Sequence, residues 1–95
     1  MATWTFLTNH AHVLVCIAKD PGVRVREIAQ RVGITERAAQ RIVTELVDEG
    51  YVARTKEGRR NSYSVKSRRP MRHPMDSDLA IGEILTVLAQ SGGSE

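Results

Sequence analysis

The chain has 95 residues and a formal net charge of +3; 41% of the residues are hydrophobic, and there is a single cysteine. This length allows one small domain and leaves no room for a separate catalytic domain. One cysteine cannot form an internal disulfide or a Cys-rich zinc site. The longest apolar run, Val13–Ala18, is too short to cross a membrane. We therefore expect a soluble cytoplasmic protein.

The net charge is unevenly distributed along the chain. Residues 1–50 carry equal numbers of basic and acidic side chains. Residues 51–72 carry eight Lys or Arg and one Glu, whereas residues 73–95 carry four acids and no Lys or Arg. A strongly basic middle segment points to a polyanionic partner.

Three helices are predicted in the first half of the chain. The first runs from about Asn9 to Lys19 behind the N-cap Thr8, and it is apolar nearly all round, which is typical of a helix at the centre of a core or against another subunit. The second covers about 25–32 and ends at Gly33. The third covers about 36–49, begins behind Thr35, and has one continuous apolar stripe.

The second half begins with a change of period from helical spacing to alternation. This predicts a strand over 51–56, a turn over 57–60 and a returning strand over 61–65. A basic linker with two prolines follows over 66–74, and a last helix is expected over about 78–90, capped by Asp76 or Ser77. The fold class is mainly α with a small β-hairpin.

This order of elements resembles the winged helix-turn-helix of prokaryotic transcription regulators, in the broad group around the MarR and ArsR families. The resemblance covers about residues 9–66 and rests on the run from Val25 to Val43, on Leu46–Val52, and on the basic Gly58-Arg59-Arg60-Asn61 tip. It implies a DNA-binding domain over 1–66 with an N-terminal arm over 1–8. A linker over 67–75 and a C-terminal dimerisation helix with its tail over 76–95 complete the expected organisation.

The exposed side of the third helix carries the candidate base-reading residues. They occupy positions i, i+3, i+4 and i+7, opposite the apolar stripe. Arg can bind guanine and Gln can bind adenine through two hydrogen bonds in the major groove, and the resemblance makes this the recognition helix. The four candidates are Arg37, Gln40, Arg41 and Thr44.

The hairpin would be the wing, with cations that reach phosphates or the minor groove. The alternative is that these charges only keep a surface hairpin soluble. Arg24 stands where such regulators usually place a Ser or Thr N-cap, so it contacts either the DNA backbone or solvent. The expected backbone-contacting residues are Arg24, Thr35, Lys56, Arg59, Arg60 and Asn61.

The last helix and the first helix supply the expected dimer interface. A helix packed only on its own domain is the alternative for the last one. Gly82 would let a partner backbone approach closely. The expected interface residues are Leu14, Ile17, Leu79, Ile81, Gly82, Ile84, Leu85 and Leu88.

The sequence therefore predicts a homodimeric transcription regulator that binds double-stranded DNA, expected at a pseudo-palindromic operator, and not an enzyme. The alternatives are a protein-interaction winged helix and a sensor of a small molecule or metal. His12 and Cys16 stand at i and i+4, but no further ligand completes a metal site. We expect no metal and no cofactor, and no obvious pocket apart from the interface between helices.

Overall fold

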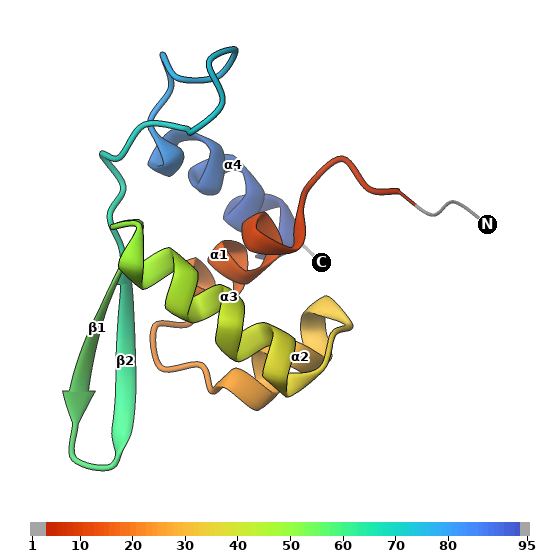
Figure 1. The fold of residues 1–95 in the computed structure, drawn as a ribbon. Helices are drawn as coiled ribbons and strands as arrows, with labels where there is room; N and C mark the ends of the chain where they lie inside the picture. Colours follow the sequence, from red (N-terminus) through yellow and green to blue (C-terminus); the bar gives the residue numbers. More distant parts are fainter. Residues whose placement is uncertain (1–3, 94–95) are drawn as a thin grey trace.

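The computed structural model describes residues 4–93, with side chains to residue 89. The helices are α1 (Asn9–Lys19), α2 (Val25–Val32), α3 (Glu36–Asp48) and α4 (Ile81–Gly93). An antiparallel hairpin of β1 (Val52–Glu57) and β2 (Arg60–Val65) lies between α3 and α4 in the chain. The hairpin and α4 extend towards opposite ends of the molecule (Figure 1). The predicted fold class, a winged helix-turn-helix with a C-terminal helix, is confirmed.

α1 lies at the centre of the core, as its apolar sequence predicted. It contacts α2, α3, α4 and β2, and its side chains Val13, Leu14, Cys16 and Ile17 are buried. The Thr8 hydroxyl accepts a hydrogen bond from the amide of Ala11, which confirms the predicted N-cap. A helix with neighbours on most sides has to be apolar around most of its circumference.

The turn between α2 and α3 follows the predicted chemistry. Gly33 adopts the left-handed conformation, with φ of 86°, where a side chain would be strained. The Thr35 hydroxyl accepts from the amide of Ala38 at 3.1 Å and begins α3. α3 ends one residue earlier than expected, with Glu49 as its C-cap, and Gly50 has φ of 85°.

The hairpin is one residue longer at its tip than the prediction. Its register runs from Val52 opposite Val65 to Glu57 opposite Arg60. Only Gly58 and Arg59 form the turn, and Gly58 has φ of 65°. The buried side chains of Val52 and Tyr63 fix its base on the helical body.

The basic segment after the hairpin returns across the molecule instead of leaving it. Pro70 forms a β-bridge with Ala80, and the amide of Met71 donates to the carbonyl of Leu79. The amide of Ile81 donates to the carbonyl of Arg69 at 2.7 Å. Residues 66–80 therefore form a closed loop between β2 and α4, at the top of Figure 1.

The predicted start and cap of the last helix are wrong. α4 begins at Ile81 and not at Asp78, because residues 74–78 form turns. The Ser77 hydroxyl donates to the carbonyl of Pro74, and the carbonyl of Asp76 accepts from the amide of Leu79. At the observed start, the Glu83 carboxylate accepts from the amide of Ala80.

One side of α4 packs on its own chain. Ile81 and Leu85 belong to the same core as Leu14 and Ile17, so none of these four expected interface residues is exposed. Gly82 also faces its own chain, since a Cβ built there would lie 2.6 Å from the Cβ of Ser67. The expectation that Gly82 admits a partner backbone is replaced by this close internal contact. Among residues 4–93, no helix is both long and apolar enough to cross a membrane.

Candidate nucleic-acid interface

The four candidate base-reading residues share one exposed face of α3. Arg37, Gln40, Arg41 and Thr44 are all exposed, whereas the opposite face buries Ala39, Ile42, Val43 and Leu46. The Gln40 amide nitrogen lies 3.4 Å from the Thr44 hydroxyl, one turn further along. The core thus holds α3 by its apolar side and leaves a polar row free for a ligand.

The N-terminus of α3 adds a donor to this face. The Thr35 oxygen already accepts the hydrogen bond from Ala38, so its hydroxyl proton remains able to donate to a phosphate. The positive end of the helix dipole lies at the same place. Glu36 in the first turn is exposed and complements that dipole.

The wing presents its cations to solvent beside α3. Arg54, Lys56, Arg59 and Arg60 are exposed. Within residues 4–93, the two ion pairs join His10 to Glu45 and Arg72 to Glu49, so neither uses a wing cation. Arg54 and Lys56 face the same side of the hairpin as Tyr63 and Asn61, because these residues are cross-strand partners.

A polar cleft separates the outer part of the wing from the start of α2. It has a volume of 770 Å³ and brings Arg24, Arg60 and Asn61 together from distant parts of the chain. The Arg24 side chain does not cap α2; the Glu27 carboxylate instead accepts from the Arg24 amide at 3.0 Å. Arg26 and Gln30, which sequence reasoning did not single out, line the same cleft. The feature of the sequence that could have indicated these two residues is their i and i+4 spacing near the start of α2.

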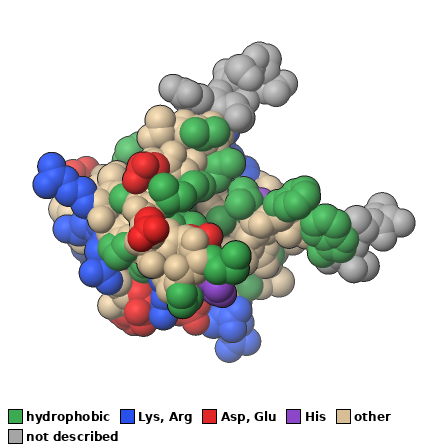
Figure 2. Space-filling view, turned by 90° about the horizontal axis from the view of Figure 1, so that it is seen from above, with side chains coloured by type: hydrophobic (Ala, Val, Ile, Leu, Met, Phe, Trp, Pro, Cys, Tyr) green, Lys and Arg blue, Asp and Glu red, His purple; other side chains and the backbone are tan. Residues whose placement is uncertain are grey.

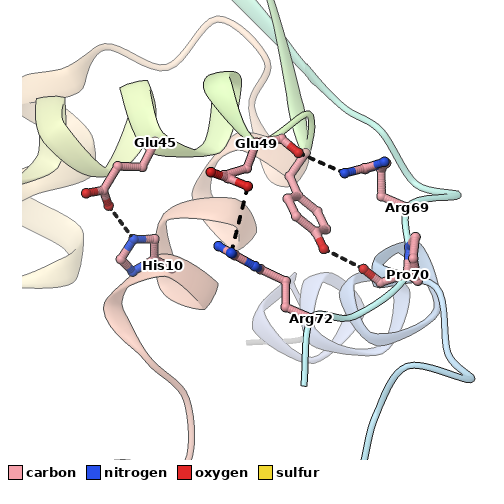
Figure 3. Close-up of polar contacts among 7 residues, drawn as sticks. His10, Glu45, Glu49, Arg69, Pro70 and Arg72 are labelled. Carbon is pink, nitrogen blue, oxygen red and sulfur yellow. Dashed lines mark hydrogen bonds and ion pairs between the residues drawn. The ribbon is translucent and has the colours of Figure 1, made fainter. Parts of the chain in front are cut away.

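Two arginines of the basic linker contact the body of the protein (Figure 3). Arg69 donates to the backbone carbonyl of Glu49 at 3.0 Å, and the Arg72 guanidinium lies 3.8 Å from the Glu49 carboxylate. Arg69 also lies over the ring of Tyr51, whose hydroxyl donates to the carbonyl of Pro70. The basic segment is therefore divided between an exposed wing and a loop that holds the end of α3. No periodic pattern in the sequence signals this cluster.

His10 and Glu45 form a polar link between α1 and α3. Their side chains meet at 2.7 Å, and both are about half exposed. Figure 3 shows this pair and the Glu49 contacts along the same side of α3. α3 is thus held by polar contacts at its C-terminal half, away from the end that carries Arg37.

Cys16 is a buried core residue. Desolvation by burial raises the pKa of its thiol, against smaller opposing effects of Arg31 and Lys19. Within residues 4–93, no group of three or more metal-binding side chains includes it. A thiol held in its neutral form is a poor nucleophile and a poor metal ligand.

The structure also contains a pocket between α1, α3 and the loop of residues 71–76, a loop that was not expected to take part in one. Its volume is 610 Å³, and it has both apolar and charged lining residues. Leu14, Leu46 and Met71 lie beside His10, Arg72 and His73. A pocket of this volume, lined by both apolar and charged side chains, is typical of small-molecule sites. The sequence does not indicate this pocket, because the residues that line it come from three distant segments of the chain.

Comparison with known families identifies this arrangement. A model described as MarR family matches residues 5–60, more than half of the chain. The chain belongs to the MarR family. The match includes α1, α2, α3 and the first strand of the wing, and it ends at Arg60. A search of curated proteins found no match.

Solved structures support the MarR-family fold. A predicted DNA-binding transcriptional regulator from E. coli is 18% identical, with a TM-score of 0.61 over 85% of this chain and 74% of that chain. A MarR family protein of Mycobacterium tuberculosis in complex with salicylic acid is 24% identical, with a TM-score of 0.58 over 90% and 56%. The zinc-dependent MarR family regulator AdcR, in its Zn(II)-bound state, is 20% identical, with a TM-score of 0.50 over 70% and 47%. This chain therefore spans about half the length of the last two proteins.

Proposed function

We propose that this MarR-family protein is a homodimeric transcription regulator that binds double-stranded DNA in a sequence-specific manner. The observation that carries the proposal is the exposed row of Arg37, Gln40, Arg41 and Thr44 on α3, next to a wing whose exposed cations form no ion pair within the described part of the chain. Two-hydrogen-bond contacts from Arg to guanine and from Gln to adenine distinguish base pairs in the major groove. α3 is the helix that would enter that groove.

The remaining polar residues would position the protein on the phosphates. Lys56 and Arg59 are exposed on the wing, and Arg24 and Asn61 line the cleft beside it. Together with the Thr35 hydroxyl, they would hold the backbone on both sides of the major groove. Arg60, also expected on the backbone, donates instead to the Gly22 carbonyl of its own chain.

The distribution of charge supports this orientation. The wing lies at one end of the molecule, and α4, in the acidic C-terminal part of the sequence, lies at the other (Figure 1). Apolar side chains are exposed over the α4 end, with positive charge towards the margin of that view (Figure 2). One end would meet DNA, and the other would meet a second copy.

The proposed dimer interface keeps three of the eight residues expected from the sequence and adds Val87. Leu79 and Val87 are 41% and 61% exposed, and Ile84 and Leu88 are partly buried, so these four side chains have surface left for a partner. A two-fold dimer would bind two half-sites whose centres lie about 34 Å apart, or a multiple of that distance. This predicts a pseudo-palindromic operator.

Selection of bound sequences from a random DNA pool, at near-physiological salt, tests the proposal. We expect an inverted repeat to be enriched. Arg37→Ala and Gln40→Ala should each relax the preference at one base position, with a loss of about 1–3 kcal/mol of discrimination. Arg31→Ala, which removes an exposed cation from α2, is the control and should retain the preference.

A selection that enriches no sequence would reject specific recognition. Equal binding to an enriched sequence and to its scrambled version would reject it as well. That outcome would favour a protein-interaction winged helix, whose basic wing meets an acidic partner.

The pocket of 610 Å³ favours a second function, the response to a small molecule. A relative of similar fold has been solved with salicylic acid. This pocket combines apolar side chains with Arg72 and two histidines, and Glu45, Glu49 and Asp76 also line it. An aromatic carboxylate would take the place of Glu49 as the partner of Arg72. Titration with salicylate should raise the melting temperature and change DNA affinity. Arg72→Gln should weaken both effects, and Arg72→Lys should weaken them less. An unchanged melting temperature at millimolar salicylate would contradict this function for that ligand class.

A further inference from the structure

Arg60, the first residue of β2, is bound to a distant part of the chain. Its Nη2 donates to the carbonyl oxygen of Gly22 at 3.0 Å, although the two residues are 38 positions apart. Three residues further along β2, the amide of Tyr63 donates to the carbonyl of Pro21 at 2.9 Å. Two consecutive carbonyls of the turn between α1 and α2 therefore hold β2 along its free edge.

The turn that presents these carbonyls is itself firmly held. The amide of Gly22 donates to the Asp20 carboxylate at 3.1 Å, and the amide of Val23 donates to the Asp20 carbonyl at 3.0 Å. The Val23 side chain is completely buried in the core. The turn is thus a fixed support for the wing.

The outer part of the wing needs such a support. Val52 and Tyr63 fix the base of the hairpin, but Arg54 to Arg59 are exposed throughout. A two-stranded hairpin is only marginally stable without further packing. Arg60 pairs with Glu57 as the last pair before the turn, so its contact with Gly22 is a support close to the tip.

We propose that Arg60 is a positioning residue that fixes the angle of the wing against α2 and α3, while Lys56 and Arg59 contact the phosphates. The inference rests on the proposed DNA-binding function. It assigns different roles to two adjacent arginines: the Arg60 side chain is directed to a backbone carbonyl, and the Arg59 side chain is exposed with no protein hydrogen bond among the described residues. A glutamine at position 60 ends two bonds short of the Arg60 Nη2 and so loses the contact, whereas the longer lysine can still donate one hydrogen bond.

The first measurement needs no DNA. Hydrogen exchange of the Tyr63 amide reports how often β2 separates from Pro21. In Arg60→Gln, this amide should exchange roughly 2 to 10 times faster, as expected for the loss of one hydrogen bond. Arg59→Gln, the matched control, should leave its rate unchanged. Equal rates in both variants would overturn the proposal even if the protein proved not to bind DNA.

The second measurement uses the selected operator and its salt dependence. Arg59→Gln should make the log–log slope of affinity against salt shallower by about 0.9, because one phosphate contact is lost. Arg60→Gln should lower affinity roughly fivefold with an unchanged slope, because Lys56 and Arg59 still meet phosphates, and should shift the protected DNA positions only where the wing lies. Arg60→Lys should recover most of the affinity. A slope that falls by about 0.9 in Arg60→Gln would show a phosphate contact and overturn the proposal.

A substitution in the turn that carries the Gly22 carbonyl distinguishes a positioning role of Arg60 from a general loss of folding. Asp20→Ala removes the acceptor that shapes the turn, whereas Asp20→Asn keeps an acceptor oxygen. Asp20→Ala should reproduce the faster exchange of Tyr63 and the shifted protection by the wing, with protection by α3 retained. The combined Asp20→Ala and Arg60→Gln variant should be little worse than either alone. Fully additive losses of affinity in the combined variant would contradict the positioning role of Arg60. A parallel loss of DNA protection by α3 and by the wing would contradict it too.

Discussion

The Arg69 guanidinium donates a hydrogen bond to the backbone carbonyl of Glu49, the residue that caps the C-terminus of α3. The last carbonyls of a helix have no partner within the helix, and the dipole makes this end negative. A cation 20 residues further along the chain therefore satisfies one of these carbonyls. The same guanidinium lies 5.4 Å from the centre of the Tyr51 ring.

Loss of this contact should destabilise the protein. Arg69→Met keeps the apolar stem but removes the donors, so we expect the free energy of unfolding to fall by about 1 kcal/mol. Urea denaturation followed by circular dichroism measures this change. Arg68→Met, at the exposed neighbouring position, should have little effect; equal losses in the two variants would show that the cap is unimportant.

Substitution of Gly82 should be costly for a steric reason. A Cβ at this position would lie 2.6 Å from the Cβ of Ser67 and 2.9 Å from its carbonyl oxygen, so α4 or the loop must move. We expect Gly82→Ala to lower the free energy of unfolding by roughly 1–3 kcal/mol, despite the higher helix propensity of alanine. In the control Gly22→Ala, the nearest contact is 3.7 Å and the change should be small. A stabilised Gly82→Ala variant would contradict the observed packing.

Cys16 should make stability depend on pH in the alkaline range. Burial raises the pKa of its thiol in the folded state, so the unfolded chain loses this proton first as the pH rises. The stability that the neutral, buried thiol contributes is complete below about pH 8.5 and is lost progressively as the pH rises above this value. The free energy of unfolding should therefore fall more between pH 7 and pH 10 in the wild type than in Cys16→Ala.

Iodoacetamide should modify Cys16 slowly in the folded protein and rapidly in urea. Equal rates would show that the thiol is accessible.

The exposed side of α4 should control association. Val87→Glu places a charge on the proposed interface while leaving the buried Ile81 and Leu85 untouched, so the dimer should dissociate to a folded monomer. Sedimentation velocity and circular dichroism measure the two properties separately. Thr86→Glu, which points about 100° away around the helix, should remain dimeric. A Val87→Glu protein with unchanged mass would place the interface elsewhere.

The sequence predicted the helical body closely because its signals are local. α1 and α2 have the predicted bounds, and α3 differs only at its C-terminus, since the caps Thr8 and Thr35 and the turn residue Gly33 each act within a few residues. The exposed row on α3 followed from the same periodicity. These features need no information from distant parts of the chain.

The C-terminal third was predicted less well because long-range contacts determine it. The bridge between Pro70 and Ala80 and the bond from Met71 to Leu79 delay the start of α4, and no period in the sequence encodes them. The roles of Arg60 and Arg69 were hidden for a related reason. Both bind backbone carbonyls, which every residue carries, so the sequence offers no distinctive partner.

The loop of residues 66–80 also determines how the molecule can come apart. Arg69 holds the end of α3 through its side chain and the start of α4 through its carbonyl, which accepts from Ile81. α4 cannot leave the body without disturbing this residue, and loss of the Arg69 contact would take this donor from the Glu49 carbonyl. The helix proposed to read DNA and the helix proposed to join two copies thus belong to one cooperative unfolding unit, whose amides should open together.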